Sequence, residues 1–245
     1  MPVVLNLDNY DLAHFVREAA GFGIERYGYV VTPNVDHFIR FHDDSTFRTA
    51  YADASYVLLD SRVLSTLLRW ARGIVAPVCT GSDLTAALCR TVLRPQDPVV
   101  VIGGSAAQAV RIAEDFGLRQ LQHLDPPMGF IRDEAATERC LEFIEAASPF
   151  RFCFLAVGSP QQEQLAQQLK RRGRARGLAL CIGASINFLT GDEQRAPGWM
   201  QRLSLEWLYR LLRDPARLTH RYLIRGPRVF GLLRTTDVLM RGPES

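Results

Sequence analysis

Apolar runs that end in turn residues alternate with helical patterns along most of this chain, and this alternation narrows the possible folds more than any other feature. Five such runs predict buried strands, at residues 27–34, 55–61, 98–104, 151–159 and 178–185, with a sixth expected at 74–79. Helical patterns cover residues 35–53, 82–93, 105–116, 133–147 and 160–172. Continuous apolar strands between helices are typical of a mostly parallel sheet with helices on both faces. The sequence therefore predicts an α/β, Rossmann-like fold.

The pattern changes at Arg195. Residues 199–215 predict one helix with a broad apolar surface, formed by Leu205, Trp207, Leu208, Leu211 and Leu212. Pro215 should end this helix, and Pro227 can begin another. Four arginines recur at helical spacing on one face, namely Arg217, Arg221, Arg225 and Arg228. The last stretch, residues 229–240, is apolar enough to lie against another surface. We therefore expect an α/β core over residues 1–194 and a helical appendage over residues 195–245.

Charge is divided unevenly between these two parts. The whole chain has a formal net charge of +3, but residues 195–245 hold ten arginines and four acidic residues, which leaves residues 1–194 mildly acidic. A basic segment on an acidic core suggests a polyanionic partner, such as anionic lipid, a diphosphate or nucleic acid. A non-catalytic nucleic-acid-binding module is therefore an alternative function. The sequence offers it no recognised nucleic-acid-binding motif and no aromatic platform interleaved with the arginines.

The sequence also argues against several other classes of protein. No apolar run approaches the roughly 18 residues of a membrane-spanning helix, and the first residues do not resemble a secretory signal, so we expect a cytoplasmic protein. Five single cysteines argue against a disulfide framework or a structural zinc site. The glycine-rich signatures of dinucleotide-binding and P-loop proteins are missing. Because D-x-D is missing and His37 and His42 are badly spaced for a metal, we expect no catalytic metal and no cofactor.

Polar residues and glycines follow each predicted strand, where open parallel sheets bind their ligands. These positions converge on one rim and include Thr32, Asn34, Asp60, Gly103, Gly104, Gly158, Ser159, Gln161, Gln162, Glu163, Ser185 and Asn187. Asp60 directly follows an apolar run, so partial burial can raise the pKa of its carboxyl and make it a general base. Two alternatives for this carboxyl are binding of a ribose hydroxyl and pairing with Arg62.

Two of these strand ends also have an ordinary structural explanation. Gly103 and Gly104 can offer backbone N–H groups and a helix dipole to a phosphate, or they can form a tight strand–helix turn. Ser159, Pro160 and Gln162 fit an S-x-x-Q capping box, whose helix N-terminus can still present Gln161 or Glu163 to a ligand.

Eight motifs occur in order along the chain. They are T-P-N-x-D-H (32–37), Asp60, P-P-M-G-F (126–130), V-G-S-P-Q-Q-E (157–163), I-G-A-S-I-N-F-L-T-G (182–191), R-A-P-x-W-M-Q-R (195–202), L-E-W-L-Y-R-L (205–211) and P-x-R-L-x-x-R-Y-L (215–223). Together they resemble the WecG/TagA/CpsF family, glycosyltransferase family 26, over nearly the whole chain.

The resemblance implies an inverting, metal-independent transfer of a hexose-type sugar from a UDP-sugar to a polyprenyl-diphosphate-linked acceptor. This reaction serves surface or exopolysaccharide synthesis at the inner face of the cytoplasmic membrane. The family's catalytic residues correspond to Asp60, as the base, with Thr32, Asn34 and Gln162. Its C-terminal arginines, which complete the site and contact the membrane, correspond to Arg217 and Arg221.

Substrate-binding residues are expected from the strand ends and the motifs together: Gly103, Gly104, Met128, Gly129, Phe130, Gly158, Glu163, Ser185 and Asn187. One position departs from the family's pattern, because Ser61 follows Asp60 where many members have glycine. Glycine permits close approach or an unusual φ. The difference counts against N-acetylmannosamine-type specificities and looks more like the exopolysaccharide branch that includes the xanthan glucosyltransferase GumM. The apolar appendage can lie on lipid or between the protomers of a homo-oligomer.

Overall fold

The structure is a computed structural model that describes residues 3–203 and 205–242, and only the backbone of residues 201, 202 and 217. The main sheet contains β2 (Tyr27–Val31), β3 (Tyr56–Val57), β4 (Pro98–Ile102), β5 (Gln120–Leu124), β6 (Phe152–Leu155) and β7 (Gly177–Cys181). A separate two-stranded sheet pairs β1 (Val3–Asp8) with β8 (Thr236–Arg241).

Helices connect the strands of the main sheet and continue after it. Those before residue 190 are α1 (Leu12–Gly21), α2 (Val35–Asp43), α3 (Ser45–Ala52), α4 (Arg62–Arg72), α5 (Gly81–Thr91), α6 (Ala106–Asp115), the 3-10 turn η1 (Phe130–Arg132), α7 (Glu134–Ala146), α8 (Gln161–Arg172) and α9 (Ser185–Leu189). Those after it are α10 (Gly198–Arg202), α11 (Glu206–Arg213), α12 (Pro215–Thr219), the π-helical turn η2 (His220–Arg225) and α13 (Arg228–Thr235).

The main sheet is parallel, in the order β3-β2-β7-β6-β4-β5. Both of its faces are buried, because alternate residues of one strand enter two different cores. Val99 and Val101 pack with α1, α5, α6 and α9, whereas Val100 and Ile102 pack with α2, α3, α4, α7 and α8. This layering confirms the predicted Rossmann-like α/β fold.

Side-chain caps begin several helices at the carboxyl edge of the sheet, as the sequence chemistry favours. The side chain of Asn34 accepts from two backbone N–H groups of α2, and Ser61 accepts from Leu64 N at the start of α4. Thr80 caps α5, and Ser105 caps α6 in a full capping box with Gln108. These caps place four helix N-termini along the carboxyl edge of the sheet.

Several expected elements differ from the structure. The single helix predicted over 35–53 is two helices, because Asp44 caps a new helix through Thr46 N and Phe47 N. The sixth strand predicted at 74–79 is wrong: this backbone is irregular, although Cys79 N bonds Leu59 O, and Pro77 has no N–H to offer a ladder. The helix predicted over 199–215 is divided into α10 and α11, and Pro215 is the first residue of α12.

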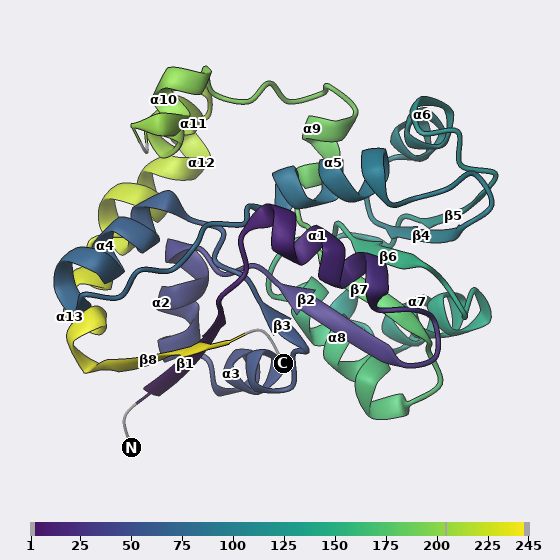
Figure 1. The fold of residues 1–245 in the computed structure, drawn as a ribbon, viewed down its shortest axis with the longest axis horizontal. Coiled ribbons are helices and arrows are strands. Elements are labelled where there is room, and N and C mark those ends of the chain that lie inside the picture. Colours follow the sequence, from purple (N-terminus) through teal and green to yellow (C-terminus); the bar gives the residue numbers. More distant parts are fainter. Residues whose placement is uncertain (1–2, 204, 243–245) are drawn as a thin grey trace.

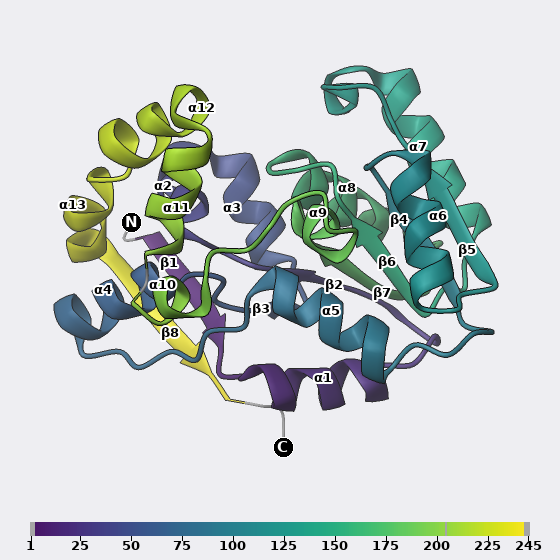
Figure 2. The same ribbon diagram turned by 90° about the horizontal axis from the view of Figure 1, so that it is seen from above.

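The C-terminal segment is helical as expected, except that its end forms β8. Figure 1 shows β8 beside β1, next to α13 and α4, and Figure 2 shows the connection from α9 crossing to α10. β8 runs parallel to β1, with Val3 opposite Thr236. Asp8 of β1 joins the two sheets, since its Oδ2 accepts from Val57 N at 2.6 Å and pairs with Arg241 at 2.7 Å. The last strand is thus tied to the first.

Candidate active site

Three of the predicted site residues converge on Gly81, the first residue of α5. A Cβ atom at Gly81 would lie 3.4 Å from Ser185 Oγ, 3.5 Å from Thr32 Oγ1 and 3.9 Å from Asp60 Oδ2. These side chains come from the ends of β7, β2 and β3, which are neighbours in the sheet. Sequence reasoning missed Gly81, although it follows Thr80 in a T-G-S-D sequence typical of a helix N-terminus.

Asp60 lies partly buried in this cluster. Its backbone N–H donates to Pro33 O at 2.9 Å, and its carboxyl accepts from the backbone N–H of Gly81. Burial raises the pKa of Asp60 to about 7, with Arg210 and the Gly81 N–H acting to lower it and Glu206 and Asp83 acting to raise it. A carboxyl with this pKa can accept a proton near neutral pH.

Side chains around Asp60 also hold the backbone of the loop after β7. Thr32 Oγ1 donates to Cys181 O at 3.3 Å, and Ser185 Oγ donates to Ile182 O at 2.6 Å. Gln162 Oε1 accepts from Gly183 N at 2.9 Å. Thr32, Gln162 and Ser185 therefore meet at one loop, as their positions at strand ends predict.

The capping box expected at Ser159 is wrong. α8 begins after Pro160, which takes the N-cap position in place of Ser159 and makes no side-chain cap hydrogen bond. Gln162, expected to reach back to the helix N-terminus, instead bonds Gly183 across the sheet edge. Its Nε2 donates to Glu163 Oε1 at 3.0 Å. Glu163 is fully buried, and burial raises the pKa of its carboxyl.

Asn34 and His37 form a second polar group, at the start of α2. Asn34 Oδ1 accepts from Asp36 N at 3.0 Å and from His37 N at 3.1 Å. His37 Nδ1 bonds the hydroxyl of Tyr51 at 3.0 Å, and burial lowers the pKa of His37 to about 3. This imidazole is therefore neutral and holds α2 against α3.

The C-terminal segment reaches this site through α11. The guanidinium of Arg210 lies over the ring of Phe188, 5.2 Å from its centroid, and pairs with Glu206 at 3.1 Å. Arg195, before α10, forms an ion pair with Asp83 on the first turn of α5. Arg210 was not among the predicted site residues, although it stands in the L-E-W-L-Y-R-L motif.

The arginines predicted to share one face bind α2 instead of standing free. Arg221 lies 3.6 Å from Asp36, and Arg225 and Arg228 lie 3.7 and 2.8 Å from Asp43. Arg217 belongs to α12, but its side chain is outside the described part of the structure. This pairing fastens the segment to the helix that Asn34 begins.

The profile of the glycosyl transferase WecG/TagA/CpsF family matches residues 3–241. The chain belongs to this family. It is therefore a glycosyltransferase of the kind that acts in cell-surface polysaccharide synthesis, and its core and C-terminal segment both lie within the match.

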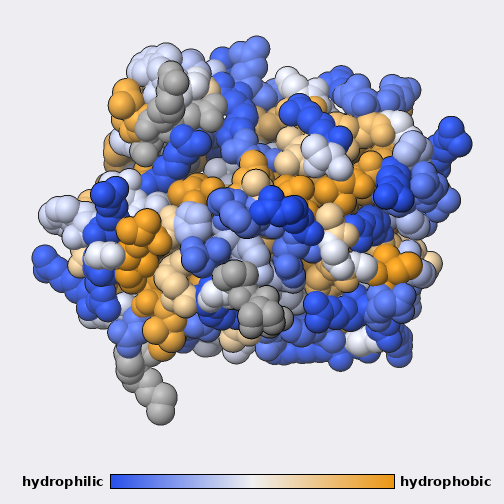
Figure 3. Space-filling view, in the orientation of Figure 1, coloured by the Kyte–Doolittle hydropathy of each residue, from blue (hydrophilic) through white to orange (hydrophobic). Residues whose placement is uncertain are grey.

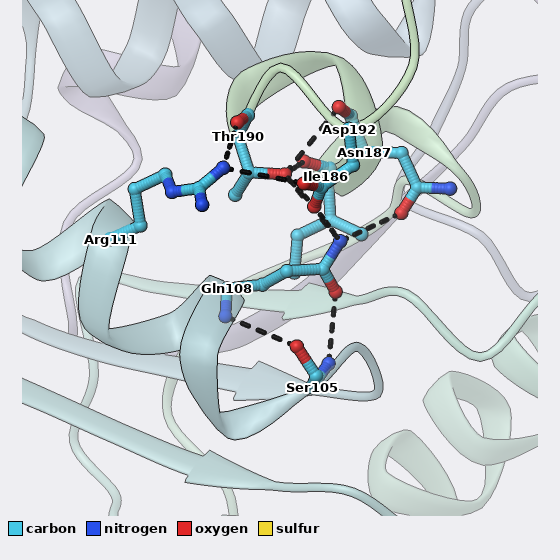
Figure 4. A network of polar contacts seen from close by, with 7 residues as sticks. All are labelled: Ser105, Gln108, Arg111, Ile186, Asn187, Thr190 and Asp192. Atoms are coloured by element: carbon cyan, nitrogen blue, oxygen red, sulfur yellow. Dashed lines mark hydrogen bonds and ion pairs between the residues drawn. The ribbon is translucent and has the colours of Figure 1, made fainter.

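In this glycosyltransferase, Gly103 and Gly104 form a tight turn between β4 and α6, with φ values of 91° and 74°. Figure 4 shows the polar network beside the turn. Ser105 and Gln108 satisfy each other's backbone N–H groups, and Gln108 Nε2 also donates to Asn187 Oδ1 at 3.0 Å and to Asp192 Oδ2 at 2.7 Å. Two N–H groups at this helix N-terminus thus already have partners.

The P-P-M-G-F segment lies far from Asp60 in the order of the sheet. It follows β5, at one edge, whereas Asp60 follows β3, at the other edge. Met128 is 98% exposed, Gly129 has a positive φ of 76°, and Phe130 is buried in the core. Gly158, also with a φ of 76°, follows β6 between these edges. The predicted substrate-binding residues are thus spread along the rim and are not gathered in one place.

Two further features concern residues 3–203 and 205–242 of this family member. Within them, no three His, Cys, Asp or Glu side chains come together as a metal-binding group. Over the same residues, no helix combines the length and the apolar character that crossing a bilayer requires.

Proposed function

We propose that this glycosyltransferase moves a hexose-type sugar from a UDP-sugar to a polyprenyl-diphosphate-linked acceptor, with inversion and without a catalytic metal. The environment of Asp60 is the observation that carries the proposal. A base near neutral pKa stands at the carboxyl edge of a parallel sheet, where such folds bind their ligands.

In the proposed reaction, the acceptor hydroxyl oxygen bonds to the anomeric carbon while the bond from that carbon to the UDP oxygen breaks. The Asp60 carboxylate takes the hydroxyl proton, and UDP leaves with the bonding electron pair. Thr32, Asn34 and Gln162 are the further catalytic residues of the proposal. Thr32 and Gln162 support the proposal because both bond the backbone of the loop that contacts Gly81. Asn34 supports the proposal by its position two residues after Thr32.

Cations must then stabilise the leaving diphosphate. Arg210 is suited to this role, because it lies close enough to Asp60 to affect the pKa of that carboxyl and comes from the segment after residue 194. Arg217 and Arg221 are the arginines that the family resemblance favours for this role. Arg221 could bind the diphosphate only by breaking its ion pair with Asp36 or by contacting Asp36 and the diphosphate together. The donor is expected along the rim toward Gly103, Gly104, Ser185 and Asn187.

The acceptor's lipid places the enzyme on the inner face of the cytoplasmic membrane as a peripheral protein. The division into a core (1–194) and an appendage (195–245) that contacts the bilayer belongs to this proposal. Exposed apolar side chains on the appendage support it: Leu203, Leu212, Leu223, Ile224 and Phe230. Figure 3 shows apolar residues, in orange, gathered near α4 and the β1–β8 sheet beside the appendage. The same side chains would also suit a homo-oligomer interface.

The alternative of a nucleic-acid-binding module rests on the basic charge of the C-terminal segment, and three of its regularly spaced arginines, Arg221, Arg225 and Arg228, face acidic partners on α2. Membership of a glycosyltransferase family favours the enzyme.

The test is an assay of UDP release and product mass, with and without EDTA. UDP-glucose, UDP-N-acetylmannosamine and its uronic acid are each offered with lipid-diphosphate saccharide acceptors. The proposal predicts acceptor-dependent release with one donor that resists EDTA. Loss of activity in EDTA would contradict metal independence, and release without an acceptor would contradict transfer.

A further inference from the structure

Glu163 is a buried carboxyl that accepts a hydrogen bond from the side-chain amide of its neighbour, Gln162. It stands on the first turn of α8, is 0% exposed, and accepts from Gln162 Nε2 at 3.0 Å through Oε1. Among the described residues, its other oxygen, Oε2, has no hydrogen-bond partner. Burying a carboxyl with one oxygen unpartnered costs stability, so its presence here points to a role other than stabilising the fold.

The amide of Gln162 is held from two sides. Its Oε1 accepts from Gly183 N at 2.9 Å, while its Nε2 donates to Glu163. Rotation of the amide by 180° would bring Nε2 against the N–H of Gly183 and Oε1 against the carboxyl of Glu163. Both contacts would then be repulsive, so the two partners together select one orientation.

This orientation decides what Gln162 can offer to a ligand. A primary amide has two N–H groups and two oxygen lone pairs, and one of each is used by Glu163 and Gly183. The remaining N–H and lone pair are fixed in direction. Gly183 lies two residues before Ser185, which meets Thr32 and Asp60 at Gly81, so the amide is fixed relative to the reaction centre.

We propose that Glu163 is a positioning residue, which holds the side-chain amide of Gln162 in the orientation that catalysis uses and does not itself touch substrate. This inference rests on the proposed function, in which Gln162 is a catalytic residue. It replaces the substrate-binding role that sequence reasoning gave to Glu163, because a fully buried carboxyl bonded to Gln162 acts through that residue.

The first test is hydrogen exchange of the Gln162 side-chain amide by ¹⁵N NMR, with the resonances assigned by their loss in Gln162→Ala. Glu163→Met keeps length and volume but removes the acceptor, and we expect exchange to become about tenfold faster or more. Glu163→Gln keeps a carbonyl acceptor, and we expect exchange within about threefold of the native rate. Unchanged exchange in a folded Glu163→Met, or equal acceleration in Glu163→Gln, would overturn the proposal.

The matched control is Gln167→Met on the same helix. Gln167 is also buried, but its Nε2 donates to Asp53, away from Gln162. We expect this variant to leave both exchange at Gln162 and kcat unchanged, even if it lowers the melting temperature. A loss of kcat equal to that of Glu163→Met would indicate a general packing defect and overturn the proposal.

The second test is a double-mutant cycle on kcat. Glu163→Met should lower kcat about 10- to 100-fold with donor KM within about threefold, yet add less than about threefold to Gln162→Ala. Fully additive losses would overturn the positioning role. Full turnover in Gln162→Ala, or none in the native enzyme with any donor, would contradict the proposed function instead, and the exchange measurement would still decide the orientation.

Discussion

Arg210 of α11 is the charged residue that most affects the pKa of Asp60, although the two residues belong to different parts of the chain. Arg210 is held over Phe188 of α9 and beside Glu206, so its position depends on how α11 packs against the core. The site therefore includes both the α/β core and the C-terminal segment.

This relationship predicts the pH dependence of transfer. Only ionised Asp60 can act as the base, so kcat/KM should fall as the pH drops below about 7 and level off above it. Arg210→Ala removes a cation that lowers this pKa, so it should move the acid limb upward by about half a unit to one unit. Glu206→Gln should move it downward. Arg213→Ala is the control, because Arg213 stacks on Tyr209 instead. A limb that Arg210→Ala does not move would contradict the assignment.

Asp60 should also make the fold less stable as the pH rises. The pKa of Asp60 is about 7 in the folded protein against the ordinary 3.8 of an aspartate side chain, so the folded state binds more protons between these values. Stability contributed by this group therefore falls as the pH rises through that window. At pH 8, the free energy of unfolding of Asp60→Asn in chemical denaturation should exceed that of the native protein by on the order of 1–3 kcal/mol. This gain in stability should vanish near pH 4. A lower free energy of unfolding for Asp60→Asn than for the native protein at pH 8 would contradict this prediction.

Gly104→Ala should damage the turn after β4 more than its φ alone explains. A Cβ there would lie 2.8 Å from both Gln108 Oε1 and Ile186 Cδ1, in addition to the strain at a φ of 74°. Gly117→Ala is the matched control, with a φ of 63° and open space around it. We expect a loss of about 1–2 kcal/mol beyond that of the control in chemical denaturation. Equal losses of stability in Gly104→Ala and Gly117→Ala would mean that Gln108 and Ile186 move aside at little cost, which would contradict this prediction. If the turn also contacts the donor, its KM should rise.

Membrane contact can be tested without disturbing the fold. Truncation at residue 194 would also take β8 away from β1, so point variants are cleaner. Leu223→Ser combined with Ile224→Ser changes two exposed residues of η2 and should reduce sedimentation with anionic phosphatidylglycerol vesicles about tenfold. Met128→Ser, at the far edge of the sheet, should sediment like the native protein. Equal sedimentation of all three would rule out this part of the appendage as the anchor.

Much of the fold could be predicted because the buried strands of a parallel sheet form continuous apolar runs. The same logic placed Thr32, Asp60, Gln162 and Ser185 at one rim, and the structure brings three of them to Gly81 and the fourth to the adjoining loop.

The parts that could not be predicted depend on contacts between distant segments. The pairing of β1 with β8 joins the two ends of the chain and leaves no local signal in either one. β5 is an edge strand of alternating polar residues and lacks the apolar run of its neighbours. The spacing of the C-terminal arginines gave the face that they share, but their partners Asp36 and Asp43 lie on α2. Gln162 was assigned to a local cap because its partner, Gly183, lies on another strand end.

The central claim, that Asp60 is the base of a UDP-sugar transfer, is tested most directly by turnover and donor binding of Asp60→Asn. Asp53→Asn serves as control, since that carboxyl bonds Gln167 of α8 and has no contact with Asp60 among the hydrogen bonds of the described residues. We predict that Asp60→Asn lowers kcat by about 10²–10⁴-fold while the Kd for the UDP-sugar stays within about threefold. Near-native turnover in a folded Asp60→Asn would contradict the account.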